Sequence, residues 1–114
     1  MSPILVRDEE ERRSARRYKV NIRSHWAREA SREYQGVVRD LSAGGCFVES
    51  NEGVQVGDLV KLRLSITGRG DLTIWGHVAF RIRKTGFGVR FTAFSQGGAR
   101  ERLAEILDEE ERRS

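Results

Sequence analysis

The alternation of apolar and polar residues over short segments is the feature that most constrains how this chain can fold. From Tyr18 onward, Val20, Ile22 and Trp26 alternate with polar residues such as Lys19. A period of two is typical of a β-strand that buries one face. Similar segments follow at about 34–41, 46–50, 58–66, 72–83 and 87–92, and glycine-rich turns separate them.

Six short strands predict a mainly β protein, a six-stranded antiparallel β-barrel, because closure into a barrel hides the strand edges. The 12 glycines and the single proline fit this architecture. In the last two strands, alternation predicts that Ile74, Val78, Phe80, Ile82, Phe87, Val89 and Phe91 face inward. Outward-facing positions between 75 and 83 are then Trp75, His77, Arg81 and Arg83.

A helix is predicted for the end of the chain. Ser95 is a candidate N-cap, and the apolar residues after it recur at helical spacing, at Ala99, Leu103, Ile106 and Leu107. This helix is expected to run from about residue 96 to near the end and to pack on the barrel. The predicted organisation is therefore a mobile N-terminal arm at 1–17, a barrel at 18–94 and a C-terminal helix at 95–114.

The charge balance favours an anionic partner. The 114 residues carry a formal net charge of +4, and most of the cations are arginine. Arginine suits planar, bidentate recognition of phosphates and guanine edges better than lysine does. A single cysteine, Cys46, excludes an internal disulfide and a cysteine-based zinc site. With no signal-peptide core and no apolar stretch of about 20 residues, we predict a soluble cytoplasmic protein without membrane insertion.

The sequence offers little for catalysis. His25 and His77 fall on different predicted strands without a metal-ligand cluster, and Cys46 has no obvious base partner. No phosphate-binding loop is present. We therefore expect a protein that is not an enzyme and holds no metal.

Two short segments together indicate a binding site. The first, RRSARR, places Arg13 and Arg17 four residues apart, and the second, DLSAGG, begins at Asp40 and contains Ser42. Taken singly, the first is typical of a solvated basic arm and the second of a hairpin turn. Taken together they fit a guanine nucleotide. Arginine donates to guanine O6 and N7, a carboxylate accepts from the N1 and N2 protons, and arginine and serine hold phosphate.

These segments resemble the two motifs of the PilZ domain family. RRSARRYKV is similar to the RxxxR motif, with Arg13 and Arg17 in its arginine positions, and DLSAGG is similar to the (D/N)xSxxG motif. GFGVRF resembles a late strand of the family. The resemblance implies a β-barrel that binds cyclic di-GMP on its outer surface while the arm closes over the ligand. The ligand-binding residues that it implies are Arg12, Arg13, Arg17, Asp40, Ser42, Gly44 and Gly45.

Two further expectations follow from the resemblance. Arg12, just before RxxxR, resembles family members that bind a stacked ligand pair, so we expect two cyclic di-GMP molecules per chain and no other cofactor. A receptor of this kind is expected to act on a downstream protein partner in motility, polysaccharide or regulatory machinery.

Other interpretations remain open from the sequence alone. A small basic barrel could instead bind RNA or DNA, although only Trp75 clearly offers an aromatic platform, so we consider nucleic acid the less favoured partner. A barrel that has lost ligand sensing and acts as a structural partner is the third interpretation. The string DEEERRS occurs twice, at 8–14 and at 108–114. In the first copy, Arg13 is followed four residues later by a second arginine, Arg17. The second copy has no such arginine in this sequence.

Overall fold

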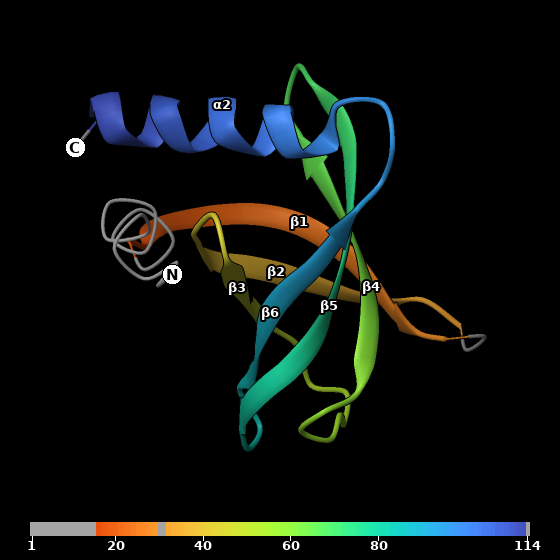
Figure 1. The fold of residues 1–114 in the computed structure, drawn as a ribbon. Helices are drawn as coiled ribbons and strands as arrows, with labels where there is room; N and C mark the ends of the chain where they lie inside the picture. The colour runs from red at the N-terminus through yellow and green to blue at the C-terminus, as the bar shows by residue number, and fades with distance from the viewer. Residues whose placement is uncertain (1–15, 30–31, 114) are drawn as a thin grey trace, which may run out of the picture.

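The computed structural model describes residues 16–29 and 32–113 as six strands and one helix. The elements are β1 (Tyr18–Arg28), β2 (Tyr34–Leu41), β3 (Gly45–Glu49), β4 (Leu59–Ile66), β5 (Gly70–Ile82), β6 (Gly86–Phe94) and α2 (Ala99–Arg113). The strands close into an antiparallel barrel in the order β1-β2-β3-β6-β5-β4 (Figure 1). The predicted barrel with a C-terminal helix is confirmed, and β2 has the predicted bounds.

The barrel interior is filled by apolar side chains that alternate along the strands. Trp26 lies at its centre, with no exposed surface. Its ring meets Phe87 edge-on at a centroid distance of 5.0 Å and Tyr34 at 4.9 Å. The indole N–H donates to Ser50 Oγ at 3.2 Å, so the one polar atom of this large side chain is satisfied.

The end of β5 departs from the predicted alternation. Ile74 and Val78 are buried as predicted, but Phe80 is 45% exposed and Ile82 is 51% exposed. The cause is a β-bulge, because β5 advances by two residues from Val78 to Phe80 while β6 moves by one. An extra residue shifts every later side chain to the opposite face. The inward prediction for Phe80 and Ile82 is therefore wrong.

The helix begins later than predicted because β6 continues further along the chain. The strand pairs with β5 as far as Phe94, and the Ser95 N–H donates to Thr73 O at 3.1 Å, so Ser95 extends the sheet rather than capping the helix. Gly97 and Gly98 then both adopt φ of 88°. Only glycine adopts this conformation readily, and the pair turns the chain into α2. The Arg102 N–H donates to Gly98 O at 2.9 Å, so the helix starts at this glycine turn.

α2 lies across one end of the barrel (Figure 1). It buries Ala99, Leu103 and Ile106 against the strands. Arg69, in the β4–β5 turn, binds two of its carboxylates, Glu105 and Glu109, each at 2.8 Å. No helix in the described part of the chain has the length and apolar character needed to cross a membrane.

Candidate ligand-binding site

The β2–β3 turn is organised around the buried hydroxyl of Ser42. Its Oγ accepts the N–H groups of Gly44 and Gly45 at 3.2 and 3.1 Å. The backbone N–H of Ser42 donates to Gly45 O at 2.8 Å. Ser42 is only 1% exposed. These contacts use the side chain to fix the turn, which holds the end of β2 in one conformation.

Gly45, the second glycine of this turn, allows β3 to lie close to β6. A Cβ on Gly45 would lie 2.3 Å from Val89 O, closer than any real side chain approaches. The Gly44 carbonyl accepts the Phe91 N–H at 2.9 Å. Glycine at the end of the DLSAGG motif is therefore required by the packing of the barrel itself.

Arg17 and Asp40 come from the two motif segments and meet on the outer surface of the barrel. Arg17 Nη1 lies 2.7 Å from Asp40 Oδ1. Tyr18 opposes Leu41 and Lys19 opposes Asp40 in the β1–β2 register, which brings the start of β1 beside the end of β2. Both side chains are partly exposed, at 48% and 33%. An ion pair at this exposure contributes about 1 kcal/mol or less, so it can be exchanged for other partners.

The remaining predicted arginines, Arg12 and Arg13, lie outside the described residues. The described part of the predicted set gathers at one place, where the start of β1 meets the β2–β3 turn. The part that each of these residues plays toward a ligand stays a prediction.

The end of α2 is fastened to the residues that flank Arg17. Arg16 Nη1 lies 2.9 Å from Glu111 Oε2, and the Tyr18 hydroxyl donates to Glu111 Oε1. The Arg16 guanidinium also lies over the Tyr18 ring, 5.5 Å from its centroid. The hydrogen bond to Glu111 raises the pKa of Tyr18. The second DEEERRS copy thus contacts Arg16 and Tyr18 through Glu111. The sequence did not indicate this role.

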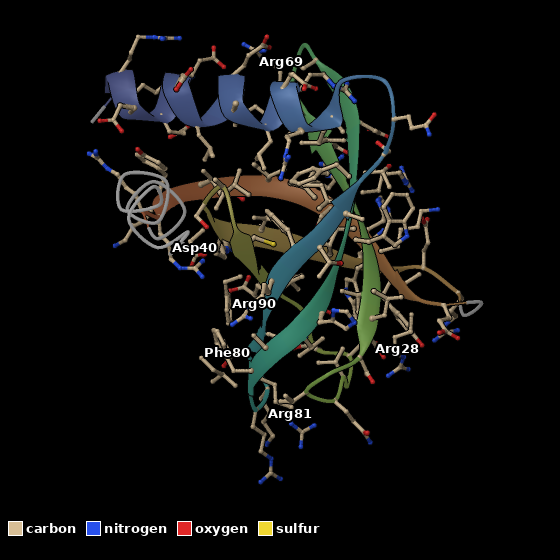
Figure 2. The ribbon with its side chains drawn as sticks, in the orientation of Figure 1. Arg28, Asp40, Arg69, Phe80, Arg81 and Arg90 are labelled. Atoms are coloured by element: carbon tan, nitrogen blue, oxygen red, sulfur yellow. The ribbon has the colours of Figure 1, made fainter. Side chains whose placement is uncertain are left out.

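An aromatic pair adjoins Asp40 on the outer face of the barrel. The rings of Phe47 and Phe80 stack at a centroid distance of 6.1 Å and an interplanar angle of 26°. Phe47 opposes Asp40 in the β2–β3 register. Phe80 lies over Gly88, where an added Cβ would meet the ring at 2.2 Å. Figure 2 shows Asp40, Arg90 and Phe80 following one another down the same side.

Sequence reasoning missed this aromatic pair, because alternation placed Phe80 inside. The signal that could have found it is Gly88, which lies between Phe47 and Phe80 in the strand register. A residue without a side chain in the middle of a strand leaves room for a ring from the next strand to lie flat.

Cys46 does not provide a reactive thiol. It is fully buried, and burial raises the pKa of its thiol far above the ordinary value, with the nearby Asp40 carboxylate adding to the effect. A thiol that stays protonated is neither a nucleophile nor a metal ligand. Within 16–29 and 32–113, no three His, Cys, Asp or Glu residues are grouped so that they could hold a metal ion.

The sequence profile of the PilZ domain matches residues 11–109, which is most of the chain and includes both motif segments. This chain belongs to the PilZ domain family. No curated protein is significantly similar to it in sequence.

Solved structures of PilZ proteins have the same fold. The PilZ domain of YcgR from Escherichia coli, solved with c-di-GMP, superposes with a TM-score of 0.68 over 86% of this chain and 90% of that one, at 15% identity. The PilZ domain of CeSA, from a cellulose-synthesizing bacterium, gives 0.65 over 85% and 99%, at 19% identity.

A longer protein is similar over part of its length. The inhibitor of motility MotI/DgrA of Bacillus subtilis superposes with a TM-score of 0.71 at 16% identity, and the match covers 86% of this chain. The PilZ domain described here spans about half of that protein, 50% of its chain. At these identities the likeness is one of fold.

Proposed function

We propose that this PilZ domain is a non-enzymatic receptor for cyclic di-GMP. The observation that carries the proposal is the meeting of Arg17 and Asp40, 23 residues apart in sequence, on the outer surface of the barrel. Two structural neighbours support it, because YcgR and the Klebsiella protein MrkH have been solved as c-di-GMP complexes.

Arg17 and Asp40 offer complementary chemistry to a guanine base. Arg17 donates to O6 and N7, and Asp40 accepts from the N1 and N2 protons. The two side chains satisfy each other at 2.7 Å. Binding therefore replaces one exposed ion pair by charge-assisted hydrogen bonds to the ligand, and the exchange costs little because such a pair is weak.

The stacked rings of Phe47 and Phe80 give the ligand an apolar surface beside these polar groups. Base stacking on an aromatic side chain is worth about 1–3 kcal/mol per base. Ser42, Gly44 and Gly45 act by holding the turn that positions Asp40, with the backbone left close to the surface where a ligand would lie.

Arg12 and Arg13 complete the proposed site from the arm. Closing the arm over the ligand costs conformational entropy, which the charge-assisted contacts of these arginines offset. We propose that the closed arm and the ligand together form a new surface for a downstream protein partner. With Arg12 beside the motif, we propose a stoichiometry of two ligands per chain.

Isothermal titration calorimetry of the full chain with cyclic di-GMP tests the proposal. We expect saturable binding with an end point at two and no binding of cyclic di-AMP, because the adenine N1 acceptor does not match Asp40 and the adenine amino donor does not match Arg17. Arg17→Ala should weaken binding roughly five- to 150-fold, the equivalent of about 1–3 kcal/mol for one bidentate contact.

Arg113→Ala is the matched control, because Arg113 lies outside both motif segments and, among the described residues, its ion pair is with Glu110 of the same helix, at 3.0 Å. It should bind as the parent chain does. If Arg17→Ala binds as tightly as the parent, the site has been misplaced. An end point at one ligand per chain would contradict the proposed stoichiometry of two, but not the proposal that the protein is a receptor.

A further inference from the structure

A groove on the outer face of the barrel lies outside the candidate ligand site. It has a volume of about 890 Å³ and is bounded by β1, β2 and β3 on one side and by the β5–β6 turn on the other. None of the described motif residues lines it. Arg23, one of two β1 residues in its lining with His25, is six positions beyond Arg17, which corresponds to about 20 Å along a strand.

The groove has positive charge without compensation. Arg23 and Lys84 line it, and neither is held in an ion pair by any residue that the structure describes. Its one carboxylate, Glu49, is already paired with Arg39 at 3.0 Å. The sequence from 72 to 100, which forms the β5–β6 side, contains no Asp or Glu. The groove therefore favours an anionic occupant.

The neutral part of the lining suits a polypeptide. The side-chain amides of Gln35 and Asn51 make no hydrogen bond within the described residues, and each can both donate and accept. A peptide backbone presents one donor and one acceptor per residue. A row of phosphates offers acceptors only, and it would meet the Glu49 carboxylate.

Apolar side chains lie in and beside the groove. Val37 lines the groove. Ile82 is 51% exposed and pairs with Gly86, which on its other side pairs with the lining residue Glu49. A flat lipid surface does not enter a concave groove, whereas a single extended chain does. Successive residues of an extended chain point to opposite sides, so carboxylates and aliphatic groups can be presented separately.

We propose that this groove is the docking site for an extended acidic segment of a partner protein, in which acidic residues alternate with branched aliphatic ones. The carboxylates meet Arg23 and Lys84, the aliphatic side chains cover Val37 and Ile82, and the peptide backbone bonds to Gln35 and Asn51. Docking at this place is separate from the proposed nucleotide site.

A synthetic peptide of the stated chemistry provides the probe. Fluorescence anisotropy is measured for fluorescein-labelled EIDLEVDLE titrated with the full chain, and the uncharged peptide QINLQVNLQ serves as the peptide control. We expect saturable binding of the acidic peptide only. Arg23→Glu and Lys84→Glu should each weaken it at least tenfold.

Lys61→Glu is the matched control, because Lys61 is an exposed lysine on β4 outside the groove. It should change the affinity less than twofold, and thermal melts of all three variants should coincide with the parent. Equal losses at Lys61, Arg23 and Lys84 would show general charge attraction and overturn the proposal. So would an affinity that neither groove substitution alters.

Two other occupants are distinguished by further measurements on the full chain. If the peptide binds only after Glu9, Glu10 and Glu11 are replaced by glutamine, the chain's own acidic run fills the groove and the proposal fails. If sedimentation shows a dimer that Lys84→Glu dissociates, the occupant is a second copy and the proposal also fails. Cyclic di-GMP titrations of Arg23→Glu and Lys84→Glu should match the parent, which keeps this test independent of the nucleotide site.

Discussion

At the scale of single residues, Phe80 and Phe87 show how a β-bulge leaves one aromatic ring on the outer surface while another on the next strand stays in the core. Both are phenylalanines on neighbouring strands, but Phe87 is 1% exposed and Phe80 is 45% exposed. Phe87 packs edge-on against Trp26, while Phe80 lies flat over Gly88 beside Phe47. The same substitution at the two positions should therefore have different consequences.

Phe80→Ala should weaken cyclic di-GMP binding by about 1–3 kcal/mol, the usual value of a stacking platform, with a small effect on stability. Phe87→Ala should lower the free energy of unfolding by about 3–5 kcal/mol, because it empties part of the core. Calorimetry gives the first quantity and urea denaturation the second. If the Phe80→Ala variant binds cyclic di-GMP as tightly as the parent chain, the Phe47–Phe80 pair is not part of the binding site.

Gly45 and Gly53 form a second matched pair. Gly45→Ala should destabilise the barrel by about 1–3 kcal/mol, because the new methyl group would be forced against Val89 O, 2.3 Å away. Gly53→Ala should leave stability within about 0.5 kcal/mol, since a Cβ there meets no atom within 4 Å. Urea denaturation of the two variants measures the difference. Equal stabilities would mean that β3 and β6 can separate at no cost.

At the scale of elements, the polar contact between the end of α2 and the start of β1 is centred on one carboxylate. Glu111 accepts from the Tyr18 hydroxyl and pairs with Arg16. A raised pKa means that the contribution of Tyr18 to folding is complete below its ordinary pKa, near 10, and is lost as pH rises through the raised value. The hydrogen bond between Tyr18 and Glu111 is therefore kept at neutral pH and lost in strong alkali.

Glu111→Gln should lower the pKa of Tyr18 toward its ordinary value, because the main cause of its increase is removed. Absorbance titration in a Tyr34→Phe background follows Tyr18 alone, since the chain has two tyrosines. Glu105→Gln, which loses only a contact to Arg69, should leave the titration of Tyr18 unchanged. An identical titration in the Glu111 variant would show that the two residues do not interact in solution.

Alternation of residue type was sufficient to predict the strands but not their irregularities. β2 had the predicted bounds although its register against β3 shifts between Val38 and Asp40. Phe80 and Ile82 were misplaced because a bulge depends on pairing with another strand, which a local pattern does not contain. The helix start was misplaced because Ser95 bonds to Thr73, a residue distant in sequence.

For the site, the motif spacing was sufficient to predict that Arg17 and Asp40 lie together. The Phe47–Phe80 pair and the Glu111 contact could not be predicted, since each joins elements whose register only the folded barrel defines. The contributions of Arg12 and Arg13 stay predictions.

At the scale of the whole molecule, the uneven charge distribution makes nucleic acid the alternative to test. The stretch from 72 to 100 has cations and no carboxylates. A protein that neutralises 6–10 phosphates loses about 10³–10⁵ in affinity between 50 and 200 mM salt. Cyclic di-GMP has two phosphates, so its binding should weaken less than about tenfold over the same range.

Calorimetry at the two salt concentrations measures this dependence, and a labelled single-stranded oligonucleotide provides the comparison. A steep loss with salt, together with tight oligonucleotide binding, would favour the nucleic-acid interpretation over the dinucleotide receptor.

The closed order of the six strands also determines what a partner of this protein can recognise. Each strand has a neighbour on both sides over part of its length, so in these paired segments the main chain has no free edge to which an incoming strand could add. Recognition over these segments therefore depends on side chains on the outside of the barrel. Specificity for a nucleotide or for a protein can then be altered one side chain at a time, while the backbone framework beneath stays the same.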